Sequence, residues 1–184
     1  MELDKDAVLT AFTNRENHPV IPGRIQNYEE TREYYPGTWE GNPLTMFSGI
    51  IHGMDVENVV IYGQGRIDGN AGFDNWWKDP KAKKTAWRPR TIFLQNCKNV
   101  VIEGITVQNS PSWTVHPYFC NHIKFIGMSI INPKDSPNTD GLDVESCNEV
   151  EITGVYFNVG DDCIALKSGK IYMGAKYKTP SKKI

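Results

Sequence analysis

A repeat of about 23 residues restricts this chain to a small set of folds. Four short apolar segments end in glycine and return at regular spacing, at residues 59–63, 100–104, 123–127 and 150–154. Helical periodicity is nowhere sustained. Three short strands per repeat with a glycine at one corner are typical of a parallel β-helix, in which each coil packs on the next. The sequence therefore predicts an all-β chain that forms a right-handed parallel β-helix.

A second series of apolar pairs supports this fold. The pairs begin at Ile92, Val115, Leu142 and Ile164, with offsets of 23, 27 and 22 residues. The longest offset is explained by an extra loop at residues 133–136. A β-sandwich would not require one residue class to return at the same place in every repeat, so the β-helix is the better interpretation.

The repeats also suggest how the chain is organised. We expect one partial β-helix domain over residues 1–184, in which coils occupy 49–169 and a loop insertion interrupts them near 69–90. Residues 1–48 are expected to be irregular, with one short strand near Val8, and 170–184 to form a basic tail. No terminal capping helix is recognisable. Because solenoids need capped ends, we expect the natural polypeptide to begin before Met1 and to continue beyond Ile184.

Charge and hydropathy exclude several classes of function. The chain has no apolar run of 18 residues, which argues against a membrane span, and its first ten residues contain no apolar signal core. A net charge of −2 argues against a nucleic-acid partner, and no obligate protein partner is evident. Residues 78–90 and 170–183 are rich in lysine and arginine. They form either solvated loops or patches that attract a polyanion.

Three of the four cysteines recur at one position of the repeat. These are Cys97, Cys120 and Cys147, while Cys163 lies elsewhere. Two disulfides are one interpretation of this number of cysteines, but recurrence at one position favours a stack of mostly buried free thiols.

Two acidic turns stand one repeat apart. Asp140 and Asp162 are 22 residues apart, and each comes two residues before an apolar strand. In register, the two would stack about 4.8 Å apart, with Asp161 beside them. Crowded carboxylates repel one another, so at least one is expected to have a raised pKa, as the acid–base chemistry of glycoside hydrolysis requires. The alternative is that these residues only form turns, which Asp, Asn and Gly favour.

Four motifs carry a likeness to a known family. They are Arg88-Pro89-Arg90, the segment from Asn109 to Pro117, Asn138-Thr139-Asp140-Gly141, and the segment from Gly160 to Gly169. Together they resemble the polygalacturonases, the pectin hydrolases of glycoside hydrolase family 28, over about residues 44–170. The Lys-Ser-Gly ending of the last motif is similar to that of bacterial members.

The resemblance implies inverting hydrolysis of α-1,4-galacturonosyl bonds in polygalacturonate or pectin, without metal or cofactor. Asp161 would then be the general acid, and Asp140 and Asp162 would hold and deprotonate the attacking water. Acid and base are expected about 6.5–9.5 Å apart. The predicted substrate-binding residues are Asn138, Lys167, His116 and Trp113, the last two with turn formation as an equal alternative. The resemblance also implies a secreted or periplasmic protein.

The sequence departs from the family in one respect. The family places a Gly-His-Gly segment and then an Arg-x-Lys segment after the Asp-Asp pair, and this chain contains neither. We therefore expect the chain alone to be inactive or severely impaired. Two other functions stay open: a calcium-dependent pectate lyase, and a non-catalytic carbohydrate-binding β-helix. No arginine lies close to either acidic turn in sequence, which counts against the lyase.

Overall fold

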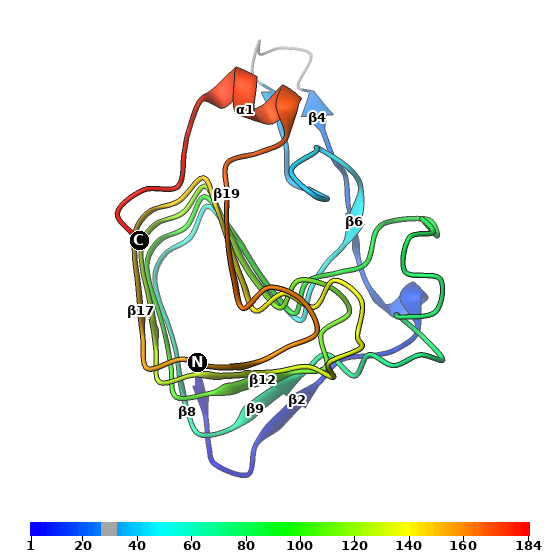
Figure 1. The fold of residues 1–184 in the computed structure, drawn as a ribbon, viewed down its shortest axis with the longest axis vertical. Helices are drawn as coiled ribbons and strands as arrows, with labels where there is room; N and C mark the ends of the chain where they lie inside the picture. The colour runs from blue at the N-terminus through cyan, green and yellow to red at the C-terminus, as the bar shows by residue number, and fades with distance from the viewer. Residues whose placement is uncertain (27–32) are drawn as a thin grey trace.

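The computed structural model describes residues 1–26 and 33–184, and these form a parallel β-helix with three sides (Figure 1). Each side is a five-stranded parallel sheet, and each complete coil contributes one strand to every side. The first sheet contains β1 (Glu2–Leu3), β8 (Glu57–Gly63), β11 (Lys98–Glu103), β14 (Asn121–Ile126) and β17 (Asn148–Thr153). The second contains β2 (Val8–Thr10), β9 (Arg66–Asp68), β12 (Thr106–Gln108), β15 (Ser129–Ile131) and β18 (Tyr156–Asn158). The third contains β7 (Ile51–Met54), β10 (Ile92–Gln95), β13 (Val115–Tyr118), β16 (Leu142–Glu145) and β19 (Ile164–Lys167).

The observed strand register confirms the predicted repeat. Along the third sheet, Ile92 pairs with Val115, Val115 with Leu142, and Leu142 with Ile164. The first three of these side chains are fully buried in one core that runs through the coils. Burial of each such aliphatic side chain contributes about 1.5–3 kcal/mol, so the continuous apolar stack holds the coils together. Ile164 is 42% exposed because β19 is the edge strand of its sheet.

Glycine recurs at one corner because the backbone there has a positive φ. Gly104 has a φ of +75°, and a Cβ at this position would lie 2.5 Å from the carbonyl oxygen of Gly63 in the preceding coil. A side chain at Gly104 would therefore be both strained and in collision, whereas Gly127 and Gly154 share with it only the positive φ, at +56° and +63°.

The β-helix extends further toward the N-terminus than the predicted range of 49–169. The strand predicted near Val8 is β2, but β2 pairs with β9, and β1 pairs with β8. Residues 1–10 are therefore part of the coil stack rather than irregular. The reason is that Leu3 and Leu9 pack against the apolar core of the next coil.

The remaining N-terminal residues and the loop insertion lie outside the coils. They include a 3₁₀ turn, η1 (Arg15–Asn17), and two small antiparallel pairs, β3 (Val20–Ile21) with β6 (Met46–Phe47) and β4 (Ile25–Gln26) with β5 (Glu33–Tyr34). The predicted insertion near 69–90 does leave the coil, and no strand is assigned within it. It is not a loose loop, because Trp76 and Trp77 are buried against Phe47.

The predicted basic tail contains a short helix, α1 (Ile171–Tyr177), which lies outside the coil next to β4 (Figure 1). Its N-cap residue Lys170 makes no side-chain capping hydrogen bond, and Met173 is its one buried residue among those described. These residues have neither a capping signal nor an apolar stripe, so a helix could not be predicted here. No helix in the described part of the chain is long and apolar enough to cross a membrane.

The cysteines form the predicted stack of thiols. Cys97, Cys120 and Cys147 are buried and free, Cys163 is free and exposed, and the backbone N–H groups of Cys97 and Cys120 donate to the sulfur of the next cysteine at 3.3 and 3.4 Å. The neighbouring thiols and burial raise the pKa of Cys97 and raise that of Cys120 to about 12.

These thiols should therefore react very differently. Because the thiolate is the reactive form, we expect a thiol reagent to modify Cys163 rapidly and the other three cysteines only after unfolding. Titration with such a reagent before and after addition of denaturant checks this. Rapid modification of more than one thiol in the folded protein would contradict the stack.

Candidate active site

The three aspartates of the acidic turns meet at one point on the third sheet. Asp140 precedes β16, while Asp161 and Asp162 precede β19, and one carboxylate oxygen from each lies within 4.8 Å of the others. The turns are joined by a hydrogen bond of 2.9 Å from the N–H of Gly141 to the carbonyl oxygen of Asp162. Glycine is required at position 141, since a Cβ there would lie 2.5 Å from the carbonyl oxygen of Cys163. The predicted stacking of the aspartates is confirmed.

The environments of the three carboxylates differ. Asp140 is 4% exposed, whereas Asp161 and Asp162 are exposed. Burial, reinforced by the charge of Asp161, raises the pKa of Asp140 to about 6, and the nearby Lys167 opposes part of this shift. The predicted raised pKa therefore falls on Asp140, and burial contributes more to it than mutual repulsion does.

Lys167 links the carboxylate cluster to the sheet. Its side chain leaves the outer face of β19, and its Nζ lies 3.1 Å from Asp143 Oδ1 and 3.9 Å from Asp140 Oδ2. The same ammonium lies 4.3 Å from the ring centre of Trp113, in a cation–π contact. Lys167 is thus already paired with protein groups, and a substrate carboxylate would compete with Asp143 for it.

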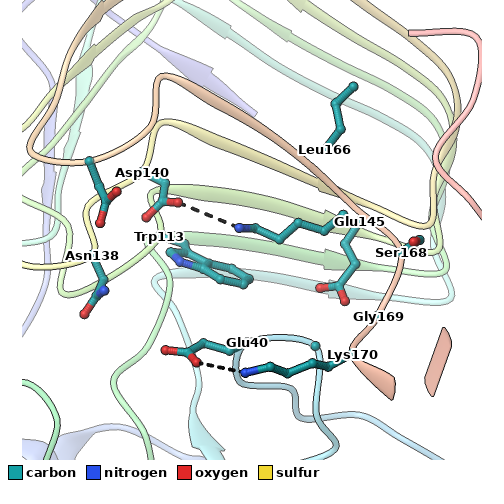
Figure 2. A pocket seen from close by; sticks show the side chains of 12 residues that line it. Glu40, Trp113, Asn138, Asp140, Glu145, Leu166, Ser168, Gly169 and Lys170 are labelled. Carbon is teal, nitrogen blue, oxygen red and sulfur yellow. Dashed lines mark ion pairs between the residues drawn. The ribbon is translucent and has the colours of Figure 1, made fainter. Parts of the chain in front are cut away.

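A cavity of about 510 Å³ opens beside the aspartates. Residues from three parts of the chain line it: Glu40 and Gly41; Trp113, Asn138, Asp140, Glu145 and Asp161; and residues 166–170. Figure 2 shows Asp140 on one side, with a dashed line to the lysine of β19, and Glu40 paired with Lys170 on the other. The predicted residues Asn138, Lys167 and Trp113 all lie at this cavity, whereas Asp162 belongs to the carboxylate cluster but is not among the residues that line the cavity.

His116 does not reach the cavity. It lies on the outer side of β13, as predicted, but it is fully buried and hydrogen-bonded through Nε2 to Glu145 at 2.9 Å. Burial lowers the pKa of His116 to about 4, so the ring is neutral at ordinary pH. The prediction that His116 contacts substrate fails because residues far away in sequence cover this part of the sheet, among them Tyr35 and Met46.

Two buried arginines contact residues that line the cavity. Arg88 donates to Asn138 Oδ1 at 2.6 Å and to two backbone carbonyl groups, which fixes the loop before Asp140. Arg90 is 1% exposed, and its guanidinium lies 4.9 Å from the ring of Trp113. Burial lowers the pKa of Arg90 to about 10, while the carboxylates of Asp143 and Glu145 oppose the shift. Both arginines belong to a stretch predicted to be solvated or to attract a polyanion, but in the structure both are buried.

Asp143 and Glu145 are two further acidic residues next to the site that were not predicted as site residues. Both are fully buried on the outer face of β16, where they alternate with core residues Leu142 and Val144. Burial, and next the charge of Asp140, raises the pKa of Asp143 well above its usual value. Two acids on one face of a strand were the available signal, and in the structure each is paired with a side chain of a neighbouring coil, Asp143 with Lys167 and Glu145 with His116.

The carboxylate cluster could also ligate a cation. Asp140, Asp161 and Asp162 each offer an oxygen at a mutual spacing within 4.8 Å, and Asp140 Oδ1 has no hydrogen-bond partner among the described residues. Carboxylate oxygens are the ligands that calcium prefers. The site therefore fits two functions, acid–base catalysis and metal binding, and these need to be distinguished.

The sequence profile of the glycosyl hydrolases family 28 matches residues 32–179. The chain belongs to this family. A relative from Vitis vinifera, named "Probable polygalacturonase", is 35% identical over 184 residues, which are 99% of this chain and 35% of the relative. A relative from Arabidopsis thaliana with a similar name is 35% identical over 72% of this chain. The chain thus spans about a third of the length of these family members.

Solved structures of the family have the same fold. A polygalacturonase from Erwinia carotovora ssp. carotovora matches 91% of this chain with a TM-score of 0.69 and 25% identity, and 45% of its own length is covered. An exopolygalacturonase from Thermotoga maritima matches 100% of this chain with a TM-score of 0.80 and 24% identity, and 46% of that chain is covered. The predicted right-handed parallel β-helix is confirmed.

Proposed function

We propose that this chain supplies the catalytic carboxylates of a polygalacturonase, a hydrolase of α-1,4-galacturonosyl bonds in polygalacturonate or pectin. The observation that carries the proposal is the meeting of Asp140, Asp161 and Asp162 at a cavity on the outer face of a β-helix. Membership of family 28 supports the same reaction class. A secreted or periplasmic location, inferred from the family, would bring such an enzyme to its polymer.

The three carboxylates divide the reaction between them. Asp161 donates a proton to the glycosidic oxygen as the bond from that oxygen to the anomeric carbon breaks. Asp140 and Asp162 hold a water molecule and accept its proton as the water oxygen bonds to the anomeric carbon. Asp140 acts as a base only when ionised, so its pKa of about 6 limits the rate in more acidic solution.

The separation of the carboxylates bears on stereochemistry. Inverting glycosidases usually hold acid and base about 6.5–9.5 Å apart, and retaining ones about 5–5.5 Å apart. Here the closest oxygens lie within 4.8 Å, which is shorter than the predicted inverting distance. The distance that matters for the water is the one between the two bases, Asp140 and Asp162, and two hydrogen bonds of about 2.8 Å bridge it through one water. We propose inversion, with the water held directly between Asp140 and Asp162.

Analysis of the first product by ¹H NMR tests this proposal. Because slow turnover is expected of the chain alone, the assay uses this chain and a version extended beyond Ile184 by the coils that follow in family members, called the extended chain below. We expect new reducing ends in the β configuration, inverted from the α bond, and no unsaturated sugar. Reducing ends that first form as α would contradict inversion. Ultraviolet-absorbing unsaturated products would indicate a lyase.

The lyase is the second candidate, because the carboxylate cluster could ligate calcium. A lyase of this type also needs an arginine base at the substrate. Arg88 and Arg90 are the arginines closest to the cluster in the motifs above, both are buried, and neither is among the residues that line the cavity. Hydrolysis is therefore favoured.

A further inference from the structure

The outer face of the third sheet is covered unevenly along the stack of coils. On β10 and β13, the outward side chains of Phe93 and Tyr118 are buried beneath a cluster that includes Tyr35, Met46 and Met173. The residues that line the cavity come from the coils of β13, β16 and β19 and from the segments packed against them. None comes from β7 or β10. The segment 35–47 therefore forms the end of the cavity on this side.

A tight turn forms the end of the cavity on this side. Trp39 and Asn42 exchange backbone hydrogen bonds of 2.9 and 3.0 Å, and the tip of this turn meets Lys170. The N–H of Lys170 donates to the carbonyl oxygen of Gly41 at 3.0 Å, and its Nζ lies 3.7 Å from Glu40. A Cβ on Gly41 would lie 2.6 Å from the Lys170 nitrogen, so glycine is what allows this approach. Figure 2 shows the Glu40–Lys170 pair facing Asp140.

The base of the turn is firmly held. Trp39 stacks on Trp87 with ring centres 4.7 Å apart and planes 11° from parallel. The Arg90 guanidinium lies 5.0 Å from the ring centre of Trp39 and 4.9 Å from the ring centre of Trp113, which lines the cavity. The turn is thus tied both to the insertion and to the floor of the site, so it is a fixed wall.

A second hollow lies beyond this wall. It has a volume of about 430 Å³ and is lined by residues that include Trp39, Lys81 and Trp87. It shares only Glu40 and Asn138 with the cavity at the aspartates. Glu40 and Asn138 therefore separate the two hollows.

We propose that the turn at residues 39–42, closed by Lys170, blocks the cleft toward the N-terminal coils, so that the cavity takes the end of a uronic acid chain rather than an internal stretch. Hydrolysis would then remove short products from chain ends, with one water consumed for each bond. Lys170 is 57% exposed and lies at the wall, where its ammonium can meet the carboxylate of the terminal sugar. This inference rests on the proposed function.

Binding to polygalacturonate fractions of increasing mean length tests the block without requiring turnover. The chain carries Asp161→Asn so that the probe is not consumed, and sedimentation at saturating protein gives the number of proteins bound to each polymer chain. We expect this number to stay at one for every fraction, because only one end fits the cavity. A number that grows in proportion to polymer length would overturn the block while leaving the proposed function intact. Failure to bind any fraction would overturn both.

A double variant, Glu40→Ala with Lys170→Ala, tests the side-chain pair that closes the wall. The control is Lys124→Ala with Glu151→Ala on the first sheet, an ion pair of 2.8 Å with 55% and 50% exposed side chains, against 57% and 52% for Lys170 and Glu40. Exposed pairs of this kind contribute at most about 1 kcal/mol, so both variants should fold. We expect binding to increase with polymer length in the first variant and to stay at one in the control. A number of one in both would overturn the role given to this pair.

Discussion

Replacement of Asp161 by asparagine is expected to slow hydrolysis of polygalacturonate by about 10²–10⁴-fold, the usual contribution of a general acid. The amide has nearly the same shape, but it cannot donate a proton to the leaving oxygen. Binding of oligogalacturonates should change little, because Asp161 is exposed and the lysines at the cavity are untouched. The measurement is initial reducing-end release by the extended chain, with and without the substitution.

Two comparisons make this prediction specific. Asp135→Asn removes an exposed carboxylate from the loop before Asn138, and its rate should equal that of the parent. A galacturonide with a nitrophenol leaving group needs little protonation, so Asp161→Asn should lose much less activity on it. Equal losses on both substrates would assign Asp161 a role other than general acid. Full retention of activity on polygalacturonate would remove Asp161 from the mechanism.

Replacement of Asp140 by asparagine should make the protein more stable at neutral pH while disabling it. The pKa of Asp140 is raised from 3.8 to about 6, mainly by burial, which means that the folded protein disfavours the ionised carboxylate. A shift of about two units corresponds to about 3 kcal/mol, and the side chain is only 6% exposed, so solvent screening reduces this little. Hydrolysis should fall sharply, because the amide cannot accept the proton of water.

The pH dependence of this effect has a definite sign. Below about pH 4, Asp140 is protonated in both the folded and the unfolded chain, so the substitution should leave the free energy of unfolding unchanged. Between about pH 4 and 6, the unfolded carboxyl ionises first and the parent loses stability as the pH rises. Above about pH 6 the full difference of about 3 kcal/mol should favour the variant.

Urea unfolding followed by tryptophan fluorescence at pH 4 and pH 7 measures these differences. Asp135→Asn is again the matched control, because its carboxylate is exposed and its removal should not alter stability in a pH-dependent way. An Asp140→Asn variant that is less stable than the parent at pH 7 would show that the ionised Asp140 stabilises the fold. That result would contradict the account of Asp140 as a strained, buried carboxylate.

The coils could be predicted from sequence because each one repeats the same physical requirement. Ile92, Val115 and Leu142 occupy one position in successive coils, and a side chain there packs on its equivalents above and below. The segments outside the repeat have no such requirement. β1 and β2 contain two and three residues, too few to show an alternating pattern, and α1 buries only Met173 among its described residues.

Part of the acidic site could likewise be predicted from the sequence, and part could not. The stacking of Asp140 and Asp162 follows from register, since both stand two residues before paired strands. The burial of His116 does not follow from register, because the cluster with Tyr35 and Met46 that covers this part of the sheet belongs to the N-terminal segment. Arg90 illustrates the same point, since its sequence neighbours are basic and polar while its contacts in space are Trp39 and Trp113.

The most direct test of a metal-free hydrolase is reducing-end release from polygalacturonate in the presence of EDTA, by this chain and by the extended chain. We expect release by the extended chain to be unaffected by EDTA, and release by this chain to be slow or absent. Such a result would assign the chemistry to Asp140, Asp161 and Asp162 acting on water. Release that disappears with EDTA and returns with calcium would contradict the account, because the same three carboxylates would then be acting as metal ligands.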